Sequence, residues 1–516
     1  MVASPPAPPG ASPAVPPSAR AGARAWWGLP FLLLPALLAS MDISILFVAS
    51  PAITEALAPS ATEWLWMMDV YGFVMAGLLI TMGALGDRIG RKRLLLIGSG
   101  LFGIASVAIA WASTPEEVIA ARVLLGVGAA TLAPSTLSLI RGMFLDERQR
   151  RAAVGAWTVA FTGGAVAGPI VGGVLLEHFW WGSVFLINVP VMGVLLLTVP
   201  FLIDESRNPG ATRFDLPGAA TSFVAILGLV FAAKRLVEHG LDATGCWALA
   251  GGLAALALFL RRQRGAAHPL VDLTLFRRPA FGAAVAGQTV VAFSAAGLGL
   301  LAFTFLQTVH QLSALRAALW ALPTFAGTLV GAVLAAALAA RLRPATLLAA
   351  GLLLGTVGFL VVGTVGAGSP LTVFIGGYTV LTLGVGVVGT LANTLILTAA
   401  PPERAGAAAG ISETSNELGA ALGIATLGTV ASAVYRERVT GVPAAGETVT
   451  EALGRAADLP AAEGARLLDF AFAAYSDSVN TAAVAGAGVL AAVAVLAWLA
   501  LRREPTASNE REKTTC

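Results

Sequence analysis

Long apolar runs recur along nearly the whole chain, and they constrain its fold more than any other feature. Each run is about twenty residues long, which is the length that a helix needs to cross about 30 Å of hydrocarbon. Lipid offers no hydrogen-bond partner to open backbone groups, so these runs must be helical. The chain is 57% hydrophobic and only 12% charged, with a mean hydropathy of +0.81, which excludes a water-soluble globular fold. The sequence therefore predicts an all-α membrane protein.

The apolar runs predict fourteen membrane spans. Basic residues predict their orientation, because loops rich in Lys and Arg stay on the cytoplasmic side. With both termini inside, inner segments hold 24 of the Lys and Arg residues, outer loops hold 7, and Arg122 falls within a span. An odd number of spans is the alternative, since Lys234 and Arg235 lie on the outer side in this topology. The predicted spans are 28–51, 63–85, 94–112, 117–139, 152–176, 183–203, 215–235, 245–261, 280–308, 317–339, 346–366, 371–398, 405–432 and 478–501.

Two carboxylates, Asp42 and Asp69, lie deep inside the first two predicted spans. An ionised acid near the centre of a bilayer costs on the order of 3 kcal/mol, so an acid found there usually binds or moves charge. With a rise of 1.5 Å per residue, both acids lie at about the same depth, about 22 Å from the cytoplasmic surface. The pair therefore predicts a transport site for protons or cations.

Three more charged residues reach this layer. Glu417, on the thirteenth predicted span, lies at about 20 Å from the cytoplasmic surface, and Glu413, one turn below it, faces the same side of the helix. Arg122 is a candidate partner for the two aspartates, because a buried arginine is rarely alone. For Arg122, a purely structural ion pair is as good an interpretation as a functional role beside the aspartates. For Glu413, a hydrated position near the cytoplasmic helix end is nearly as good an interpretation as a place in the lining of a transport cavity.

The string GALGDRIGRKR at 83–93 falls in the predicted cytoplasmic turn between the second and third spans. Its glycines permit close helix approach, its aspartate can accept hydrogen bonds from an arginine or a helix N-terminus, and its basic residues hold the turn inside. The string resembles the signature of the major facilitator superfamily, and it recurs in degenerate form as LAARLRPATLL at 338–348. The resemblance implies two related halves. The gating motif that it implies comprises Gly83, Gly86, Asp87, Arg88, Gly90 and Arg91.

Other strings narrow the resemblance to the drug:proton antiporters of this superfamily. They are MDISILFVASP at 41–51, RVLLGVGAA at 122–130 and GAVAGPIVGG at 164–173. Fourteen spans are typical of the larger branch of these antiporters, which has two extra helices. Three further strings resemble the quaternary-ammonium and multidrug exporters of that branch. They are LWMMDVY at 65–71, WWGSVFLINVP at 180–190 and GAAAGISETSNELG at 406–419.

The resemblance implies a major-facilitator fold, with two six-helix bundles and two extra helices between them. It also implies export of lipophilic, mainly cationic drugs across the cytoplasmic membrane, driven by protons. The expected division is a disordered cytoplasmic tail at 1–27, an N-terminal bundle at 28–203, a linker with two extra membrane helices at 204–265, a C-terminal bundle at 266–501 with a long outer loop at 435–477, and a cytoplasmic tail at 502–516. A loop or a short surface helix is expected for 435–477.

Roles for individual residues follow from depth and resemblance together. We expect proton coupling at Asp42, Asp69 and Arg122, and substrate binding at Asp42, Asp69, Phe47, Tyr71, Phe161, Glu413 and Glu417. Ordinary packing is the stronger alternative for each of the three aromatic residues, because helix rotation is unknown. The antiporter motif, whose small faces and missing backbone donor favour a kinked and closely packed helix, comprises Gly164, Gly168, Pro169, Gly172 and Gly173.

A mechanism follows from competition at the acids. Burial favours the neutral form of a carboxylic acid, whereas a bound cation favours the ionised form. Proton and drug therefore exclude each other, and rocking of two halves around a central site turns this competition into exchange. One departure bears on substrate choice, because the related exporters carry an acid in the tenth span and PTFAGTLVGAV at 323–333 has none. Monovalent or neutral drugs are expected to suit this chain better than divalent cations.

Other functions fit the sequence less well. A narrow self-resistance exporter of one natural product would show the same motifs, and a proton-coupled uptake symporter is disfavoured by the fifth-span motif. A membrane-embedded enzyme is not expected, because His178, His239, His268 and His310 are scattered and no GxxxxGK[ST] string is present. Cys246 and Cys516 lie on opposite sides of the predicted membrane and cannot pair within one chain. We expect no cofactor, no metal, no nucleic acid and no obligatory protein partner, only small drug-like molecules, protons and lipid.

Overall fold

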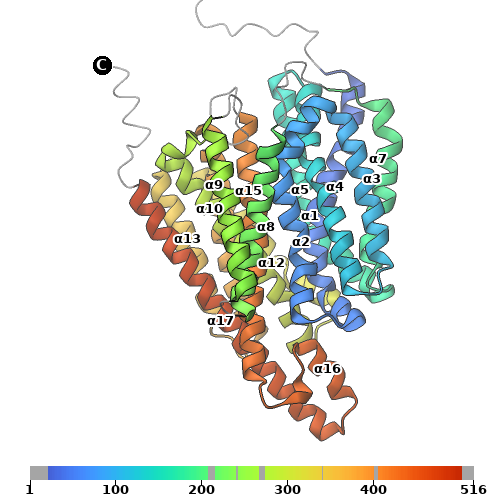
Figure 1. Ribbon diagram of the computed structural model, residues 1–516, viewed down its shortest axis with the longest axis vertical. Coiled ribbons are helices and arrows are strands. Elements are labelled where there is room, and N and C mark those ends of the chain that lie inside the picture. The colour runs from blue at the N-terminus through green and yellow to red at the C-terminus, as the bar shows by residue number, and fades with distance from the viewer. Residues whose placement is uncertain are drawn as a thin grey trace, which may run out of the picture.

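The computed structural model describes residues 21–206, 215–239, 242–265, 273–339, 341–399 and 405–501. Within these ranges the chain forms helices joined by turns, and no strand is present. Figure 1 shows two groups of long, roughly parallel helices side by side, with the N-terminal helices in one group and the C-terminal helices in the other. The expectation of an all-α membrane fold is confirmed.

The first bundle is built from the N-terminal two fifths of the chain. Asn188 begins its last helix, and a single-turn helix precedes that one. Helix α1 packs along α5, α2 and α3 both pack on α4, and α3 packs on α7. The elements are α1 (Ala23–Leu57), α2 (Ala61–Ile89), α3 (Arg91–Ala110), α4 (Pro115–Met143), α5 (Glu147–His178), α6 (Ser183–Leu186) and α7 (Asn188–Leu202).

The second bundle repeats this pattern of pairing. Helix α10 packs along α15, α12 and α13 both pack on α14, and α13 packs on α17. The two bundles thus share one pattern of helix pairing. This agrees with the two related halves that the degenerate turn sequence at 338–348 indicates. The elements are η2 (Leu275–Arg277), α10 (Pro279–Thr304), the π-helix η3 (Phe305–Val309), α11 (Ala314–Trp320), α12 (Leu322–Leu338), α13 (Pro344–Val362), α14 (Leu371–Ala399), α15 (Ala405–Arg438), η5 (Pro443–Ala445), α16 (Val449–Ala457) and α17 (Ala461–Leu501).

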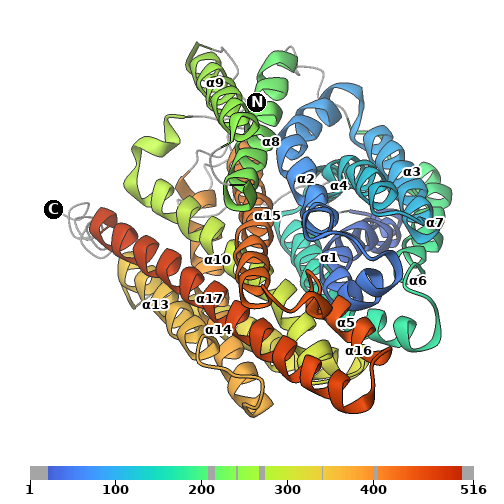
Figure 2. The same cartoon turned by 60° about the horizontal axis from the view of Figure 1, so that its bottom comes forward.

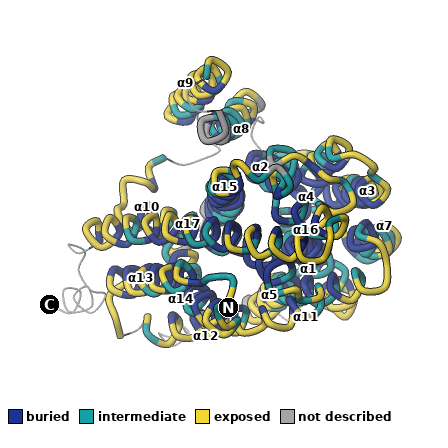
Figure 3. Tube along the Cα trace, turned by 90° about the horizontal axis from the view of Figure 1, so that it is seen from below, coloured by how far each residue is buried: buried dark blue, intermediate teal, exposed yellow. Residues whose placement is uncertain are grey.

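Two further helices, α8 (Leu216–His239) and α9 (Ala243–Gly265), pair with each other beside the bundles. Their backbones meet at two glycines, since a Cβ on Gly228 would lie 3.1 Å from the Cα of Gly252. Helix α8 contacts α2 of the first bundle and α15 of the second. Figures 2 and 3 show the α8–α9 pair standing outside the bundles, next to these two helices. The pair therefore covers one side of the junction between the halves.

The structure also bears on the number of membrane spans. Within the described residues, twelve helical segments are long and apolar enough to cross a membrane. The two remaining predicted spans, 63–85 and 215–235, coincide with α2 and α8, and both helices include residues whose side chains are not described. In α8 the described apolar stretch is Pro217–Ala232, which is shorter than a full span. The count of fourteen spans therefore stays a prediction, as does the division into five parts.

The expected outer loop at 435–477 is mostly helical. Helix α15 runs on to Arg438, α17 already begins at Ala461, and α16 lies between them. The Thr448 hydroxyl caps α16 by accepting from the backbone N–H of Glu451 at 3.2 Å. Figure 1 shows α16 and the adjoining ends of α15 and α17 projecting beyond the rest of the molecule. Of the two expectations for this segment, a surface helix describes it and an unstructured loop does not.

The molecule has two distinct ends. We call the end that carries α16 the α16 end, which is the lower end in Figure 1. The opposite end, where α1 begins and α17 finishes, also carries the turn between α2 and α3, and we call it the motif end. Helix α1 therefore runs from the motif end to the α16 end, and α2 runs back.

Candidate transport site

Asp42 and Arg122 meet in the interior of the first bundle. The Asp42 Oδ2 and Arg122 Nη1 atoms are 3.9 Å apart, and each side chain is only 1% exposed. Asp42 comes from the middle of α1, and Arg122 is the eighth residue of α4. The Arg122 Nη2 donates a hydrogen bond to the Met68 carbonyl at 3.3 Å, which ties the guanidinium to the backbone of α2 as well. Two opposite charges buried together stabilise each other, and removal of either one leaves the other uncompensated.

Asp69 and Tyr71 of α2 complete the surroundings of this arginine. Asp69 is 1% exposed and interacts electrostatically with Arg122. The Arg122 guanidinium carbon lies 5.3 Å from the centroid of the Tyr71 ring, within the range of a cation–π interaction. The structure therefore brings Asp42, Asp69 and Arg122 together in one buried cluster.

The cluster extends to the second bundle through Tyr71. Its hydroxyl lies within electrostatic interaction range of Asp42 on one side and of Glu417 and Glu413 on the other. Glu417 is 2% exposed, whereas Glu413 is half-buried and nearer the motif end. The Glu413 Oε1 and the Tyr71 hydroxyl are both enclosed and form no hydrogen bond within the described part of the chain. Acids from both bundles thus surround one tyrosine.

The two phenylalanines expected to contact substrate lie in different settings. Phe47 is 8% exposed and packs against α10 of the second bundle, where a Cβ on Gly299 would lie 3.0 Å from the Phe47 ring. Phe161 is half-buried and stacks on Trp157, with the ring centroids 5.5 Å apart and the planes nearly parallel. Phe47 therefore lies at the boundary between bundles, and Phe161 is part of an aromatic pair on α5.

Sequence reasoning missed Asn188 as a member of the site. This side chain is 1% exposed and lies close enough to the Asp42 carboxylate to interact with it. Its Nδ2 donates to the Ser106 hydroxyl at 3.1 Å, and that hydroxyl donates to the Phe102 carbonyl at 2.8 Å. Because the serine hydrogen is committed, the serine oxygen can only accept, which fixes the orientation of the amide. An asparagine in the otherwise apolar string FLINVP was the available signal.

The antiporter motif forms a close seam between α5 and α1. A Cβ on Gly164 would lie 2.2 Å from the Leu37 carbonyl oxygen, and one on Gly168 would lie 2.2 Å from the Ser44 hydroxyl. Gly172, four residues further on, faces Ile45 in the same way. The spacing of four keeps these glycines on one face of α5, so the two backbones approach as far as glycine alone permits. Pro169, inside α5, removes one backbone donor.

The last glycine of that motif faces the other bundle. A Cβ on Gly173 would lie 2.7 Å from the Cα of Leu315 in α11. Next to this contact, the Ser313 hydroxyl donates to Glu177 Oε1 at 2.8 Å. The motif thus packs α5 against its own bundle through one face and against the second bundle through its end.

The gating motif forms a tight turn at the motif end. Gly90 has φ +112°, a conformation that favours glycine, and a Cβ there would lie 2.5 Å from the Glu205 carboxyl. Gly86 is buried and packs against Arg91, whose Nη1 donates to the Pro134 carbonyl at 3.3 Å. Gly83 approaches Pro134 at an ordinary contact distance, and Arg88 is exposed. The Asp87 side chain lies outside the described residues.

Glu205 is the second residue that sequence reasoning missed. Its two carboxylate oxygens accept from the backbone N–H groups of Lys92 at 2.9 Å and Arg93 at 3.2 Å, at the start of α3. A carboxylate stabilises the positive end of a helix dipole and supplies partners for its free N–H groups. The turn between α2 and α3 is thereby fixed to the segment that follows α7. No local signal in the sequence links these two segments, because they are more than a hundred residues apart.

Three contacts join the bundles toward the α16 end. The Gln307 Nε2 of η3 donates to the Val48 carbonyl of α1 at 2.9 Å, and the Ser50 and Thr304 hydroxyls are 3.4 Å apart. Across the α2–α15 contact, a Cβ on Gly428 would lie 2.6 Å from the Leu65 side chain. Together with the contact at Gly173, these interactions close the boundary on the α16 side of the buried acids.

Comparison with known proteins places this arrangement in context. The sequence profile of the Major Facilitator Superfamily matches residues 32–424. The multidrug efflux pump LfrA of Mycolicibacterium smegmatis is 42% identical over 95% of this chain and 98% of its own length, and the methyl viologen resistance protein SmvA of Salmonella typhimurium is 34% identical over 93% and 99%. Among solved structures, a bacterial homolog of the human lysosomal transporter Spinster superposes with a TM-score of 0.65 at 19% identity, covering 93% of this chain and 97% of that one.

Proposed function

The chain belongs to the major facilitator superfamily, and from that premise we propose that it exports lipophilic, mainly cationic drugs across the cytoplasmic membrane in exchange for protons. The proposal is supported by relatives of nearly equal length that are named for multidrug efflux and methyl viologen resistance. The observation that carries it is the cluster in which Asp42, Asp69 and Arg122 lie buried together and connect through Tyr71 to Glu417. A structural core rarely needs that many buried charges.

The exchange follows from what this cluster can hold. With its acids ionised, the cluster attracts an organic cation, whereas protonation removes that attraction. Arg122 is bound to Asp42 and to the α2 backbone, so it favours the ionised acid and competes with the drug for it. We infer that protons entering from outside release the drug, and that proton loss to the cytoplasm restores the binding site. Asp42, Asp69 and Arg122 are the proton-coupling residues in this proposal.

The proposed orientation places the motif end in the cytoplasm and the α16 end outside. The basic residues of the turn after α2 support it, because such residues stay on the cytoplasmic side. Both tails are then cytoplasmic. In this orientation the contacts at Gln307, Ser313 and Gly428 close the outer side.

Dye efflux tests the function directly. Cells that express the chain should lose preloaded ethidium faster than control cells, and an uncoupler of the proton gradient should abolish the difference. Asp42→Asn and Asp69→Asn should each reduce the uncoupler-sensitive rate at least about tenfold, because an amide binds no exchangeable proton. Glu437→Gln, which removes an exposed acid remote from the cluster, is the control. Efflux that persists without a proton gradient, or that neither aspartate variant reduces, would refute the proposal.

Cation charge provides a second test. Helix α12 contains no acid, so we expect a monovalent dye to be exported faster than a bis-cationic dye of similar hydrophobicity. The relative SmvA is named for resistance to methyl viologen, which is a dication, so the comparison is informative in either direction. Competition between the two dyes in inside-out membrane vesicles would measure the preference. Equal export of both would show that the four acids on α1, α2 and α15 suffice for two charges.

A further inference from the structure

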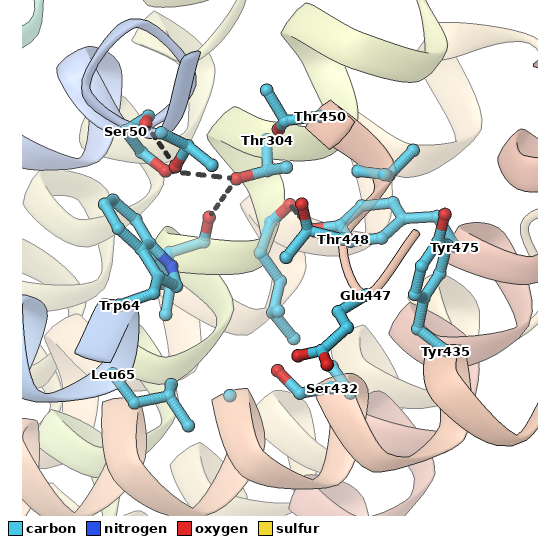
Figure 4. Close-up of a pocket in the computed structure, with 16 residues that line it drawn as sticks. Ser50, Trp64, Leu65, Thr304, Ser432, Tyr435, Glu447, Thr448, Thr450 and Tyr475 are labelled. Carbon is cyan, nitrogen blue, oxygen red and sulfur yellow. Dashed lines mark hydrogen bonds between the residues drawn. The ribbon is translucent and has the colours of Figure 1, made fainter. Parts of the chain in front are cut away.

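A small cavity lies at the α16 end, separate from the buried acids and on the boundary between the bundles. Its volume is about 70 Å³. One wall comes from α1 and α2 of the first bundle, with Ser50 and Trp64, and the opposite wall comes from α10, α15 and α17 of the second. The segment that begins α16 borders it as well, as Figure 4 shows. Because both bundles line it, this cavity widens when they separate.

Three of the lining side chains are aromatic, and two of them, Tyr435 and Tyr475, are held in place by hydrogen bonds. The Tyr435 hydroxyl donates to the Ala445 carbonyl at 3.1 Å, and the Tyr475 hydroxyl donates to the Leu301 carbonyl at 3.3 Å. The two tyrosine rings meet edge to face, with their centroids 6.4 Å apart. Trp64 lies on the other side of the cavity (Figure 4). Aromatic faces arranged around a space attract organic ammonium groups through their quadrupoles.

A carboxylate completes the lining. Glu447 lies at the cavity, with its carboxylate near Ser432 in Figure 4, and no hydrogen bond or ion pair of that carboxylate is found within the described ranges. The backbone of Glu447 is fixed, because its N–H donates to Glu451 Oε2 at 2.8 Å. Glu451 in turn forms an ion pair with Arg455, so its charge is already compensated. Of the two acids Glu447 and Glu451, Glu447 therefore lines the cavity without an ion-pair partner within the described ranges, and its carboxylate can meet a cation.

The cavity also lies along the axis that leads from the buried acids to the α16 end. Ser50 is eight residues beyond Asp42 on α1, and Gly428 is eleven residues beyond Glu417 on α15. At the rise of an α-helix these separations are about 12 and 16 Å. A drug-sized cation that left the acid layer toward the α16 end would next reach the level of this cavity.

We propose that this cavity is a second binding site, an exit site that receives the organic cation after it leaves the buried acids, with Glu447 attracting the charge and Trp64, Tyr435 and Tyr475 contacting the apolar body. The inference rests on the proposed export of cations. In the state described here the cavity has room for an ammonium head group, and separation of the bundles admits the remainder. Weak binding at an exposed site suits release, because the cation must leave again.

Ethidium binding to the purified full-length protein in lipid nanodiscs tests the exit site. Asp69→Asn weakens cation binding at the buried acids, so that ethidium binding elsewhere in the protein can be measured. We expect Asp69→Asn protein to retain a saturable component, whose affinity falls roughly fivefold when Glu447→Gln is added, as for loss of one partly exposed ion pair. Adding Glu437→Gln instead, an equal change of charge at the same end on an exposed side chain that does not line the cavity, should leave that component unchanged. Trp64→Leu should weaken it, whereas Trp64→Phe, which keeps an aromatic face, should largely preserve it.

The outcomes separate this inference from the proposed function. If Glu447→Gln has no effect, or if Glu437→Gln has the same effect, the exit site is refuted even where uncoupler-sensitive efflux is intact. If efflux is absent from the wild type but the Glu447-dependent component is present, the export proposal fails and the cation site stands. Size-exclusion profiles of the Trp64 variants identify any that do not fold. The comparison of Glu447→Gln with Glu437→Gln tests the exit site without the Trp64 variants.

Discussion

At the scale of single residues, helix rise alone predicted which charges share a layer. The depths of Asp42, Asp69 and Arg122 follow from counting residues along apolar spans, and the structure brings these three side chains into one cluster. Rotation about the helix axis is a different matter, because an apolar span in lipid carries little periodic signal. The contacts of Phe161 with Trp157 and of Asn188 with Ser106 depend on rotation, which is why counting could not predict them.

The Asp42–Arg122 pair leads to a prediction of stability. Arg122→Met should lower the free energy of unfolding by about 3 kcal/mol, because it leaves a buried carboxylate without its cation. Adding Asp42→Asn should restore part of the loss, since the amide carries no charge to compensate. Thermal unfolding of the purified variants, followed by tryptophan fluorescence, would measure both changes. A double variant no more stable than Arg122→Met would show that the two side chains do not stabilise each other in the folded protein.

At the scale of elements, the long apolar helices were predictable and the polar connections were not. A run of twenty apolar residues in lipid leaves only one backbone solution, whereas the small and charged residues of 435–477 suit a loop and a helix equally well. The pattern of Thr448 followed three residues later by Glu451 was the signal for α16, and it is short enough to arise by chance. The attachment of the α2–α3 turn by Glu205 depends on a contact remote in sequence, which no local pattern carries.

The seam between α5 and α1 offers an internal control. Gly164→Ala would place a methyl group 2.2 Å from the Leu37 carbonyl oxygen, so the helices must separate. We expect a loss of stability of about 1–3 kcal/mol, the usual cost of overpacking. The neighbouring Gly163 has no atom within 4 Å of such a methyl group among the described residues, and Gly163→Ala should be neutral or stabilising by up to about 1 kcal/mol. Equal unfolding temperatures for the two variants would show that the seam is not closely packed.

At the scale of the whole molecule, the repeated pairing of helices gives two bundles, and among the described residues three side-chain hydrogen bonds join them toward the α16 end, at Gln307, Ser50 and Ser313. Pro51 lies inside α1 and has no backbone N–H to donate to the carbonyl four residues before it, so the last turns of α1 are irregular close to one of these contacts. The Val48 carbonyl, three residues before Pro51, accepts from Gln307 of the π-helix η3. The contact therefore joins an irregular stretch of helix in each bundle. Irregular turns of this kind often occur at functional positions.

This contact predicts how the equilibrium between states can be shifted. Gln307→Ala removes one hydrogen bond between the bundles, worth about 1 kcal/mol, and so should increase the population open at the α16 end roughly fivefold.

A cysteine at position 50 reports this opening, because Ser50 is 3% exposed in the closed state. Its rate of reaction with a membrane-impermeant maleimide is measured in a protein whose Cys246 and Cys516 are replaced by serine. Gln288→Ala is the matched control, because Gln288 lies on α10 and donates to Asn416 within the second bundle. We expect faster labelling for Gln307→Ala alone. If both variants label at the wild-type rate, the Gln307–Val48 hydrogen bond does not hold the bundles closed, and the closure must depend on the packed glycine contacts at Gly173 and Gly428 instead.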